Sequence, residues 1–131
     1  MRKVLLAASA LAFAAAPAFA AAPAFAADDV MAGYYGNTLI STGGIAEIHT
    51  HFRADHSFDL TGSRMGMSRS FKGTWTIDDK ANLCRTFVGE MPPSTTNPVC
   101  SPMTAHKAGD SWTTTAKDGS TRNLTIKPGV E

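Results

Sequence analysis

The stretch that decides the fold is YYGNTLISTGGIAEIHTHFRADHSFDL, residues 34–60. Apolar and polar residues alternate in short runs, and the runs are separated by Gly43-Gly44 and by Ala54-Asp55-His56. This pattern is typical of antiparallel strands joined by tight turns. A two-residue Gly-Gly loop suits a primed turn, in which φ is positive. The sequence therefore predicts a hairpin of residues 34–42 and 45–53, with a third strand beginning after His56.

The pairing of these strands sorts their side chains onto two faces. If Thr42 lies opposite Ile45, the inward face collects Tyr35, Asn37, Leu39, Ile48, Thr50 and Phe52. The outward face then carries Thr38, Glu47, His49, His51 and Arg53. A three-residue turn with His56 in the left-handed region sets Phe52 opposite Phe58 and His51 opposite Asp59. Because a one-residue slip would scramble this sorting, the register is strongly specified.

Further alternating runs continue the pattern along the chain. Strands are predicted over residues 71–77, 83–88 and about 99–103, and a turn at Lys117-Asp118-Gly119 pairs Trp112 with Leu124. Residues 63–70 and the Pro-rich residues 89–98 are predicted to be loops. Seven or eight short antiparallel strands in meander order favour an all-β, small up-and-down barrel, because closure removes exposed edges. A two-sheet sandwich is the alternative.

The N-terminal residues predict export. Arg2 and Lys3 precede an apolar run and then small residues, which is the order of a secretory signal peptide. The unit APAFA occurs at residues 16–20 and 22–26, and we favour cleavage after Ala26 over cleavage after Ala20. Residues 27–131 then form one domain in the periplasm or outside the cell. No later run is long and apolar enough for a membrane span.

Charge and cysteine content narrow the class of partner. The chain has 12 basic and 11 acidic residues, and signs this evenly balanced and interspersed argue against a nucleic acid partner. The two cysteines, Cys84 and Cys100, predict one structural disulfide in an exported protein. We expect a monomer by default.

Several short motifs resemble a known group of proteins. They are YGNTL at residues 35–39, FRADHSF at 52–58, GTW at 73–75, LCRT at 83–86 and HKAGDSW at 106–112. Together they resemble small exported bacterial proteins with lipocalin-like β-barrels, over nearly all of the chain after the signal. The resemblance implies a barrel that holds a small apolar molecule, and it implies no catalytic residues. His56 stands where that pattern usually has Gly.

The stretch HTHFRADH, residues 49–56, holds three of the four histidines. His49 and His51 point outward and His56 lies in a turn, so the rings do not converge and no base stands beside a nucleophile. The sequence therefore does not predict an enzyme. His49 and His51 beside Met65 and Met67 in the following loop form a candidate copper site, since imidazole and thioether suit Cu(I). A simpler explanation of these four residues involves no metal: exposed histidines are common, and mobile methionines often cover a barrel mouth.

The predicted interior mixes aromatic and polar groups, as small-ligand pockets do. The candidate ligand contacts are Tyr35, Asn37, Thr50, Phe52, Trp75, Arg85 and Trp112. A solidly filled core is the alternative, because small eight-stranded barrels can be packed with side chains. If Leu83 and Phe87 point inward, Arg85 does too, and it would need a partner such as a ligand carboxylate. The opposite alternation, which the sequence slightly favours, makes Arg85 a surface residue.

The Pro-rich loop supports a different class of function. Residues 89–98 contain three prolines and lie between the two cysteines. A loop restricted in this way loses little conformational entropy on binding, so the protein could inhibit a hydrolase by displaying it. Three hypotheses result: a binder of a small, largely apolar ligand, a hydrolase inhibitor, and a periplasmic copper binder. We place them in that order.

Overall fold

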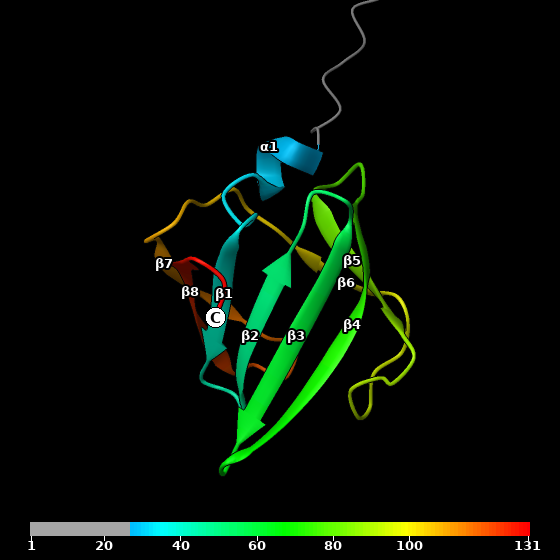
Figure 1. Ribbon diagram of the computed structural model, residues 1–131, viewed down its shortest axis with the longest axis vertical. Coiled ribbons are helices and arrows are strands. Elements are labelled where there is room, and N and C mark those ends of the chain that lie inside the picture. Colours follow the sequence, from blue (N-terminus) through cyan, green and yellow to red (C-terminus); the bar gives the residue numbers. More distant parts are fainter. Residues whose placement is uncertain (1–26) are drawn as a thin grey trace, which may run out of the picture.

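The computed structural model describes residues 27–131, and it is an all-β protein with one short helix (Figure 1). The predicted signal peptide, residues 1–26, and its two cleavage sites lie outside the described residues. The elements, in chain order, are α1 (Ala27–Met31), β1 (Asn37–Thr42), β2 (Glu47–Phe52), β3 (Ser57–Arg64), β4 (Met67–Ile77), β5 (Asn82–Val88), β6 (Val99–Pro102), β7 (Ser111–Thr115) and β8 (Thr121–Pro128).

The eight strands form one antiparallel sheet in the order β6-β5-β4-β3-β2-β1-β8-β7. The first strand pairs with the last, as in an up-and-down barrel. Strands β6 and β7 are the two edges, and within residues 27–131 they are not paired with each other. The sheet therefore curls into a half-barrel (Figure 1). The meander order is confirmed and a single sheet excludes the sandwich, but the ring is not closed by hydrogen bonds.

Two hairpins have the register that the sequence predicts. Phe52 lies opposite Phe58 and His51 opposite Asp59 in the β2–β3 pair, and Trp112 lies opposite Leu124 in the β7–β8 pair. The left-handed position of the first turn is His56, with φ 68°, as expected. Both hairpins have three-residue turns, whose length fixes the pairing on either side.

The first hairpin differs from the prediction by two residues. Leu39 lies opposite Thr50, and residues 43–46 rather than a Gly-Gly pair connect the strands. The glycines serve another purpose. A Cβ on Gly43 would lie 2.6 Å from the Thr121 carbonyl oxygen, and one on Gly44 would lie 2.1 Å from Nη1 of Arg122. They let the β7–β8 hairpin approach closely. Because the shift is two residues, the paired side chains of β1 and β2 stay on their predicted faces.

The predicted loop at residues 63–70 is instead a continuation of two strands. Arg64 lies opposite Met67, and the turn between them is Met65-Gly66 with φ 51° and 76°. Inward positions here are occupied by Gly62, Arg64 and other residues that line a cavity. These residues therefore lack the alternation of apolar and polar side chains that identifies a strand packed on a filled core, and the sequence pattern predicts a loop.

The end of the sheet beside α1 is packed solid. Val30 and Met31 of α1 are buried there, which the sequence did not predict. They cap a cluster of aromatic rings that includes Tyr34, Phe52, Phe58 and Trp75. The Trp75 indole N–H donates to the carbonyl oxygens of Arg53 and Ser57, each at 3.1 Å. This end forms the core, since a buried indole has both apolar contacts and satisfied hydrogen bonding.

The predicted disulfide is present. Cys84 on β5 and Cys100 on β6 face each other across the ladder, with their Cα atoms 4.0 Å apart. The bond attaches edge strand β6, and with it the end of the loop that precedes it, to the body of the sheet.

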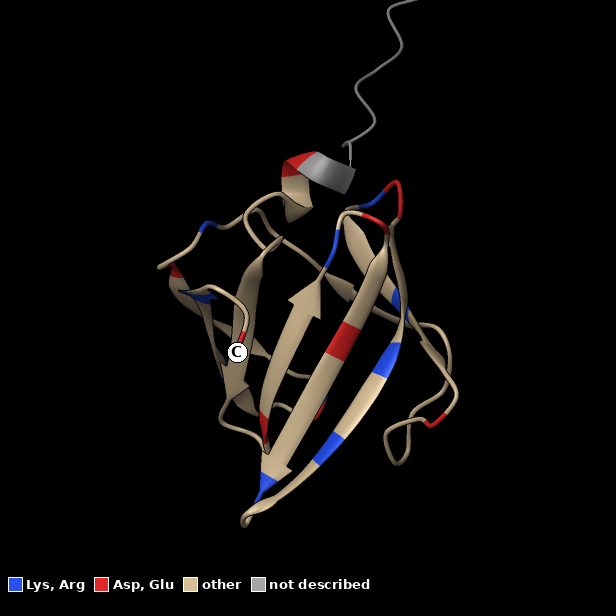
Figure 2. Ribbon diagram, viewed as in Figure 1, with Lys and Arg blue, Asp and Glu red and all other residues tan. Residues whose placement is uncertain are grey.

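Positions of charged residues are spread along the ribbon in Figure 2 without a long block of one sign. Within residues 27–131, no helix combines the length and the apolar character needed to cross a bilayer.

Candidate functional site

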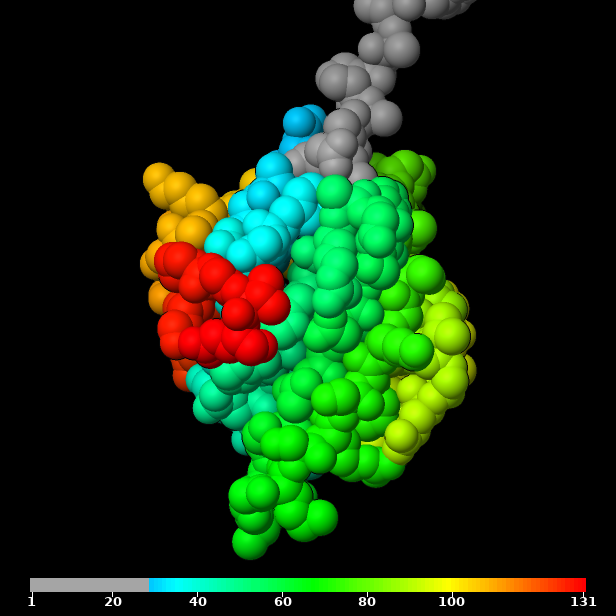
Figure 3. Space-filling model, in the orientation of Figure 1, coloured from blue at the N-terminus to red at the C-terminus, as the bar shows by residue number. Residues whose placement is uncertain are grey.

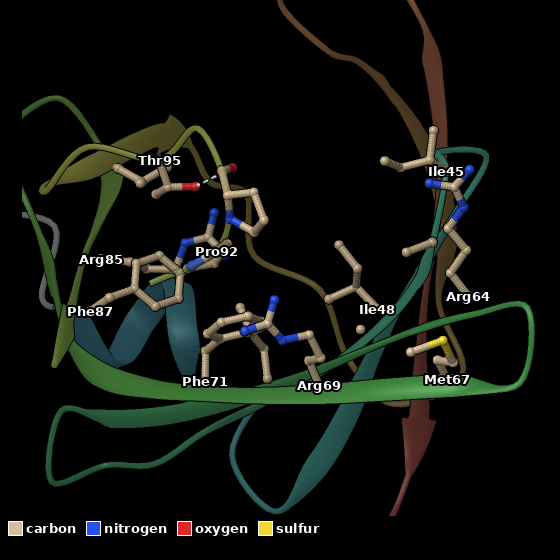
Figure 4. Close-up of a pocket in the computed structure, with 15 residues that line it drawn as sticks. Ile45, Ile48, Arg64, Met67, Arg69, Phe71, Arg85, Phe87, Pro92 and Thr95 are labelled. Carbon is tan, nitrogen blue, oxygen red and sulfur yellow. Dashed lines mark hydrogen bonds between the residues drawn. The ribbon is translucent and has the colours of Figure 1, made fainter. Parts of the chain in front are cut away.

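The concave face of the half-barrel holds a cavity of about 550 Å³ toward the end away from α1. Its floor is formed by inward side chains of four neighbouring strands, Ile48, Leu60, Phe71 and Phe87. Its walls come from two loops and a hairpin, through Ile45, Met67, Pro92 and Pro93 (Figure 4). The molecule is therefore packed at one end and hollow at the other.

Arg85 points into this cavity. Its neighbours two residues away, Leu83 and Phe87, are only 3% and 6% exposed, so the alternation of β5 turns Arg85 inward with them. Figure 4 shows the guanidinium beside Phe87 and below Pro92. The outward orientation that the sequence slightly favoured is wrong. The signal was ambiguous because Cys84, facing the other side, is also apolar.

Among residues 27–131, no carboxylate forms an ion pair with the Arg85 guanidinium. Its Nε atom is buried and makes no hydrogen bond to any of these residues. Removal from water lowers the pKa of Arg85, since a less polar environment disfavours the charged form. A buried guanidinium ordinarily has a carboxylate or a set of acceptors around it.

The other two cations of the lining, Arg69 and Arg64, are placed differently. Arg69 forms an ion pair with Glu90 and lies over the Phe71 ring, 5.7 Å from its centroid. Arg64 is exposed near the tip of the β3–β4 hairpin, where water can solvate it. Arg85 is therefore the cation of the lining that lacks both an anion and full hydration.

The mouth of the cavity is bordered by apolar side chains that water reaches. Ile45 is 80% exposed, Met65 90% and Met67 75%. The β3–β4 hairpin, which carries both methionines, projects beyond the body of the molecule (Figure 3). Exposed apolar groups gathered in one place commonly mark a binding surface.

The Pro-rich loop is one wall of the cavity and is attached at its end. The Asn97 side chain accepts a hydrogen bond from the Phe87 N–H and donates one to the Phe87 carbonyl, both at 2.9 Å. The disulfide follows three residues later. Pro92, Pro93 and Thr95 of the loop line the cavity. These contacts hold the wall against β5, next to Arg85.

The remaining predicted ligand contacts lie outside the cavity lining. Asn37 donates to the Gly33 carbonyl at 2.9 Å and accepts from the Gly129 N–H at 3.1 Å, so it ties the two ends of the domain together. The aromatic ones pack in or against the core at the α1 end, and Thr50 is buried. This group comprises Tyr35, Asn37, Thr50, Phe52, Trp75 and Trp112.

The sequence missed the residues that form the floor. Ile48, Leu60 and Phe71 are ordinary apolar strand residues, and nothing in their type separates a cavity floor from a filled core. Gly62 carries a usable signal, since it continues the inward alternation of β3 after Leu60 but has no side chain to fill the interior.

The candidate copper ligands do not converge. His49 Nε2 lies 2.6 Å from Glu47 Oε1, and His51 Nδ1 lies 2.8 Å from Asp59 Oδ2, on the convex face. Met67 lines the cavity on the concave face, and Met65 lies in the turn. No group of three or more His, Cys, Asp or Glu side chains able to hold a metal ion occurs in the described part of the chain.

Comparisons of the chain with protein-family models, curated proteins and solved structures find no match.

Proposed function

We propose that the protein is a non-catalytic binding protein that holds a small, largely apolar molecule in the concave cavity. The observation that supports this most directly is the cavity itself, whose 550 Å³ falls within the roughly 300–1,000 Å³ of typical ligand sites. Its floor and walls are mainly apolar and its polar groups are few, which is the composition of such sites.

The chemistry of the lining favours binding over catalysis. In the part of the chain that the structure describes, the polar side chains of the lining are three arginines and Thr95, without a carboxylate or a histidine. Proton transfer needs a group that titrates near the working pH, and activation of a nucleophile needs a base. We further propose that the protein acts after export. The disulfide is compatible with that compartment.

Gly62 allows a direct test of the cavity. A Cβ added at Gly62 meets nothing within 4 Å, and φ at this residue is not in the left-handed region. Gly62→Leu therefore places a side chain in the cavity without backbone strain. We expect wild-type protein to bind the neutral fluorophore N-phenyl-1-naphthylamine at one site. Gly62→Leu should bind it at least tenfold more weakly, with an unchanged urea midpoint.

The matched control is Thr61→Leu, on the convex face of the same strand, where Thr61 contacts Ser70. It adds a similar apolar side chain outside the cavity and should bind the fluorophore as wild type does. The proposal is wrong if wild type fails to bind, or if Gly62→Leu binds equally well. Native mass spectrometry of protein purified gently from the periplasm would show whether an organic molecule is retained.

The attachment of the Pro-rich loop favours a second candidate function, inhibition of a hydrolase. The loop is exposed along most of its length and is fixed at its end by Asn97 and the disulfide. Replacing residues 91–96 with a Gly-Ser segment, while Asn97 is kept, should abolish inhibition in a panel of secreted peptide and cell-wall hydrolases. If the replaced protein inhibits as wild type does, the loop is not the inhibitory element.

A further inference from the structure

We propose that the ligand is a single-chain amphiphilic anion whose carboxylate pairs with the Arg85 guanidinium while its apolar chain lies along the cavity floor. This inference rests on the proposed function and specifies the chemistry of the ligand. It is carried by an arginine that lies inside an apolar cavity without a counter-ion among residues 27–131.

The position of Arg85 favours an anion from outside residues 27–131. A cation taken out of water is unfavourable unless a negative group accompanies it. The buried Nε–H of Arg85 has no acceptor among residues 27–131, and a ligand that enters the cavity can supply one. A carboxylate matches the planar fork of a guanidinium and can accept two parallel hydrogen bonds from it.

The charge count of the lining indicates one negative charge on the ligand. Arg69 is already paired with Glu90, and Arg64 is exposed at the hairpin tip. The remaining polar side chain of the lining is Thr95. Its hydroxyl donates a hydrogen bond within its own loop, to the Pro93 carbonyl oxygen at 3.3 Å. A dianionic phosphate would find one free cation here, whereas a carboxylate needs only one.

The apolar surface indicates where the chain of the ligand lies. From Arg85, the floor runs past Phe87 and Phe71 to Leu60 and Ile48, and it ends at Ile45 and Met67 on the exposed mouth (Figure 4). The far end of this track is exposed, since Ile45 is 80% and Met67 75% exposed. A single alkyl chain fits it, and we expect affinity to rise by about tenfold for each two methylenes added up to the length of the track.

Isothermal titration calorimetry with three probes of equal chain length tests the proposal: dodecanoate, dodecanol and dodecyltrimethylammonium. We expect dodecanoate to bind wild type at least tenfold more tightly than either of the other two. Arg85→Met keeps an apolar side chain of similar length and removes the charge. It should therefore lower the affinity for dodecanoate at least tenfold and change the affinity for dodecanol less than threefold. Lys117→Met removes an exposed cation in the β7–β8 turn, outside the cavity lining, and should change the affinity for dodecanoate less than threefold.

The outcomes separate this inference from the proposed function. The inference of an anionic ligand is wrong if the neutral fluorophore or dodecanol binds wild type as tightly as dodecanoate does, or if Arg85→Met retains dodecanoate. The proposed ligand site in the cavity would still hold in either case. If neither dodecanoate nor the fluorophore binds, both proposals fail. Arg85→Lys, which keeps the charge but not the fork, should bind dodecanoate between wild type and Arg85→Met. Should Arg85→Met fail to fold, the lysine variant and the wild-type probe series decide.

Discussion

At the scale of single residues, His56 shows how a turn position that favours glycine comes to hold a histidine. Its φ of 68° is in the left-handed region, which is costly for a residue with a Cβ. Two contacts offset that cost. The imidazole stacks on the Trp75 indole, with ring centroids 4.1 Å apart and planes 9° apart, and its Nδ1 lies 3.0 Å from the Trp75 carbonyl oxygen.

We therefore predict that His56→Gly destabilises the protein although it relaxes the backbone. The relief is about 1 kcal/mol, whereas loss of the ring contact and of the hydrogen bond costs about 1 kcal/mol each. The free energy of unfolding in urea should fall by about 1 kcal/mol. The free energy of unfolding should fall further in His56→Ala, because this variant loses both contacts and keeps the backbone strain. A more stable His56→Gly would show that the stacking and the hydrogen bond together contribute less than the backbone strain costs.

A second residue-scale prediction concerns acid stability. Burial of the Asp59 carboxyl acts to raise its pKa, but hydrogen bonds from His51 and Arg53 outweigh it, so the pKa lies below the ordinary 3.8. Lys72 lies opposite Asp59 on β4. The unfolded chain thus binds a proton at higher pH than the folded protein does. The stability from Asp59 is present above its unfolded pKa and is lost as pH falls through the folded one.

Asp59→Asn should accordingly flatten the acid limb of the stability curve. In wild type, the free energy of unfolding should fall between about pH 4 and pH 2, and in the variant this fall should be shallower. Urea midpoints measured across that range test it. Asp79→Asn, in the exposed β4–β5 turn, is the control and should keep the wild-type slope. Equal slopes for wild type and Asp59→Asn would contradict the role of the His51–Asp59–Arg53 cluster.

At the scale of elements, the hairpins separate what the sequence can predict from what it cannot. The β2–β3 and β7–β8 registers follow from local turn chemistry, because three-residue turns with a left-handed third residue fix the pairing. The β1–β2 register does not, because the connection is longer than the Gly-Gly pair, and these glycines also allow close approach to the distant Thr121 and Arg122, besides the positive φ of 94° at Gly43. A contact between segments far apart in sequence leaves no local pattern.

The β3–β4 hairpin offers a prediction that depends on its turn alone. Met65 has φ 51° in the two-residue turn Met65-Gly66, where Asn is favoured and a long side chain is strained. The Met65 side chain is 90% exposed, so its removal costs little burial. Met65→Asn should raise the free energy of unfolding by about 0.5–1 kcal/mol. Met67→Asn, outside the turn, is the control and should not stabilise. A loss of stability in Met65→Asn would show that Met65 packs in solution.

At the scale of the whole molecule, the division into a packed end and a hollow end is the feature that the sequence left open. Both ends are built from the same alternating apolar strands, so composition could not tell a floor from a core. The difference arises from α1, whose Val30 and Met31 close one end, and from Gly62, which leaves space at the other. The fold was therefore predictable from period and turns, whereas six of the seven predicted ligand contacts lie outside the lining of the concave cavity.

The two ends should respond differently to the same truncation. Phe58, 1% exposed, is enclosed by other rings at the packed end, with the Phe87 centroid 5.3 Å away. Phe71, 8% exposed, has one side on the cavity. Phe58→Ala opens a new void and should cost about 4 kcal/mol, near the upper part of the range for such changes. Phe71→Ala enlarges a space that already exists and should cost about 2 kcal/mol, mainly the loss of apolar burial. Urea unfolding of the two variants measures the difference. Equal losses would mean that the cavity is collapsed in solution, and the concave site would then have no room for a ligand.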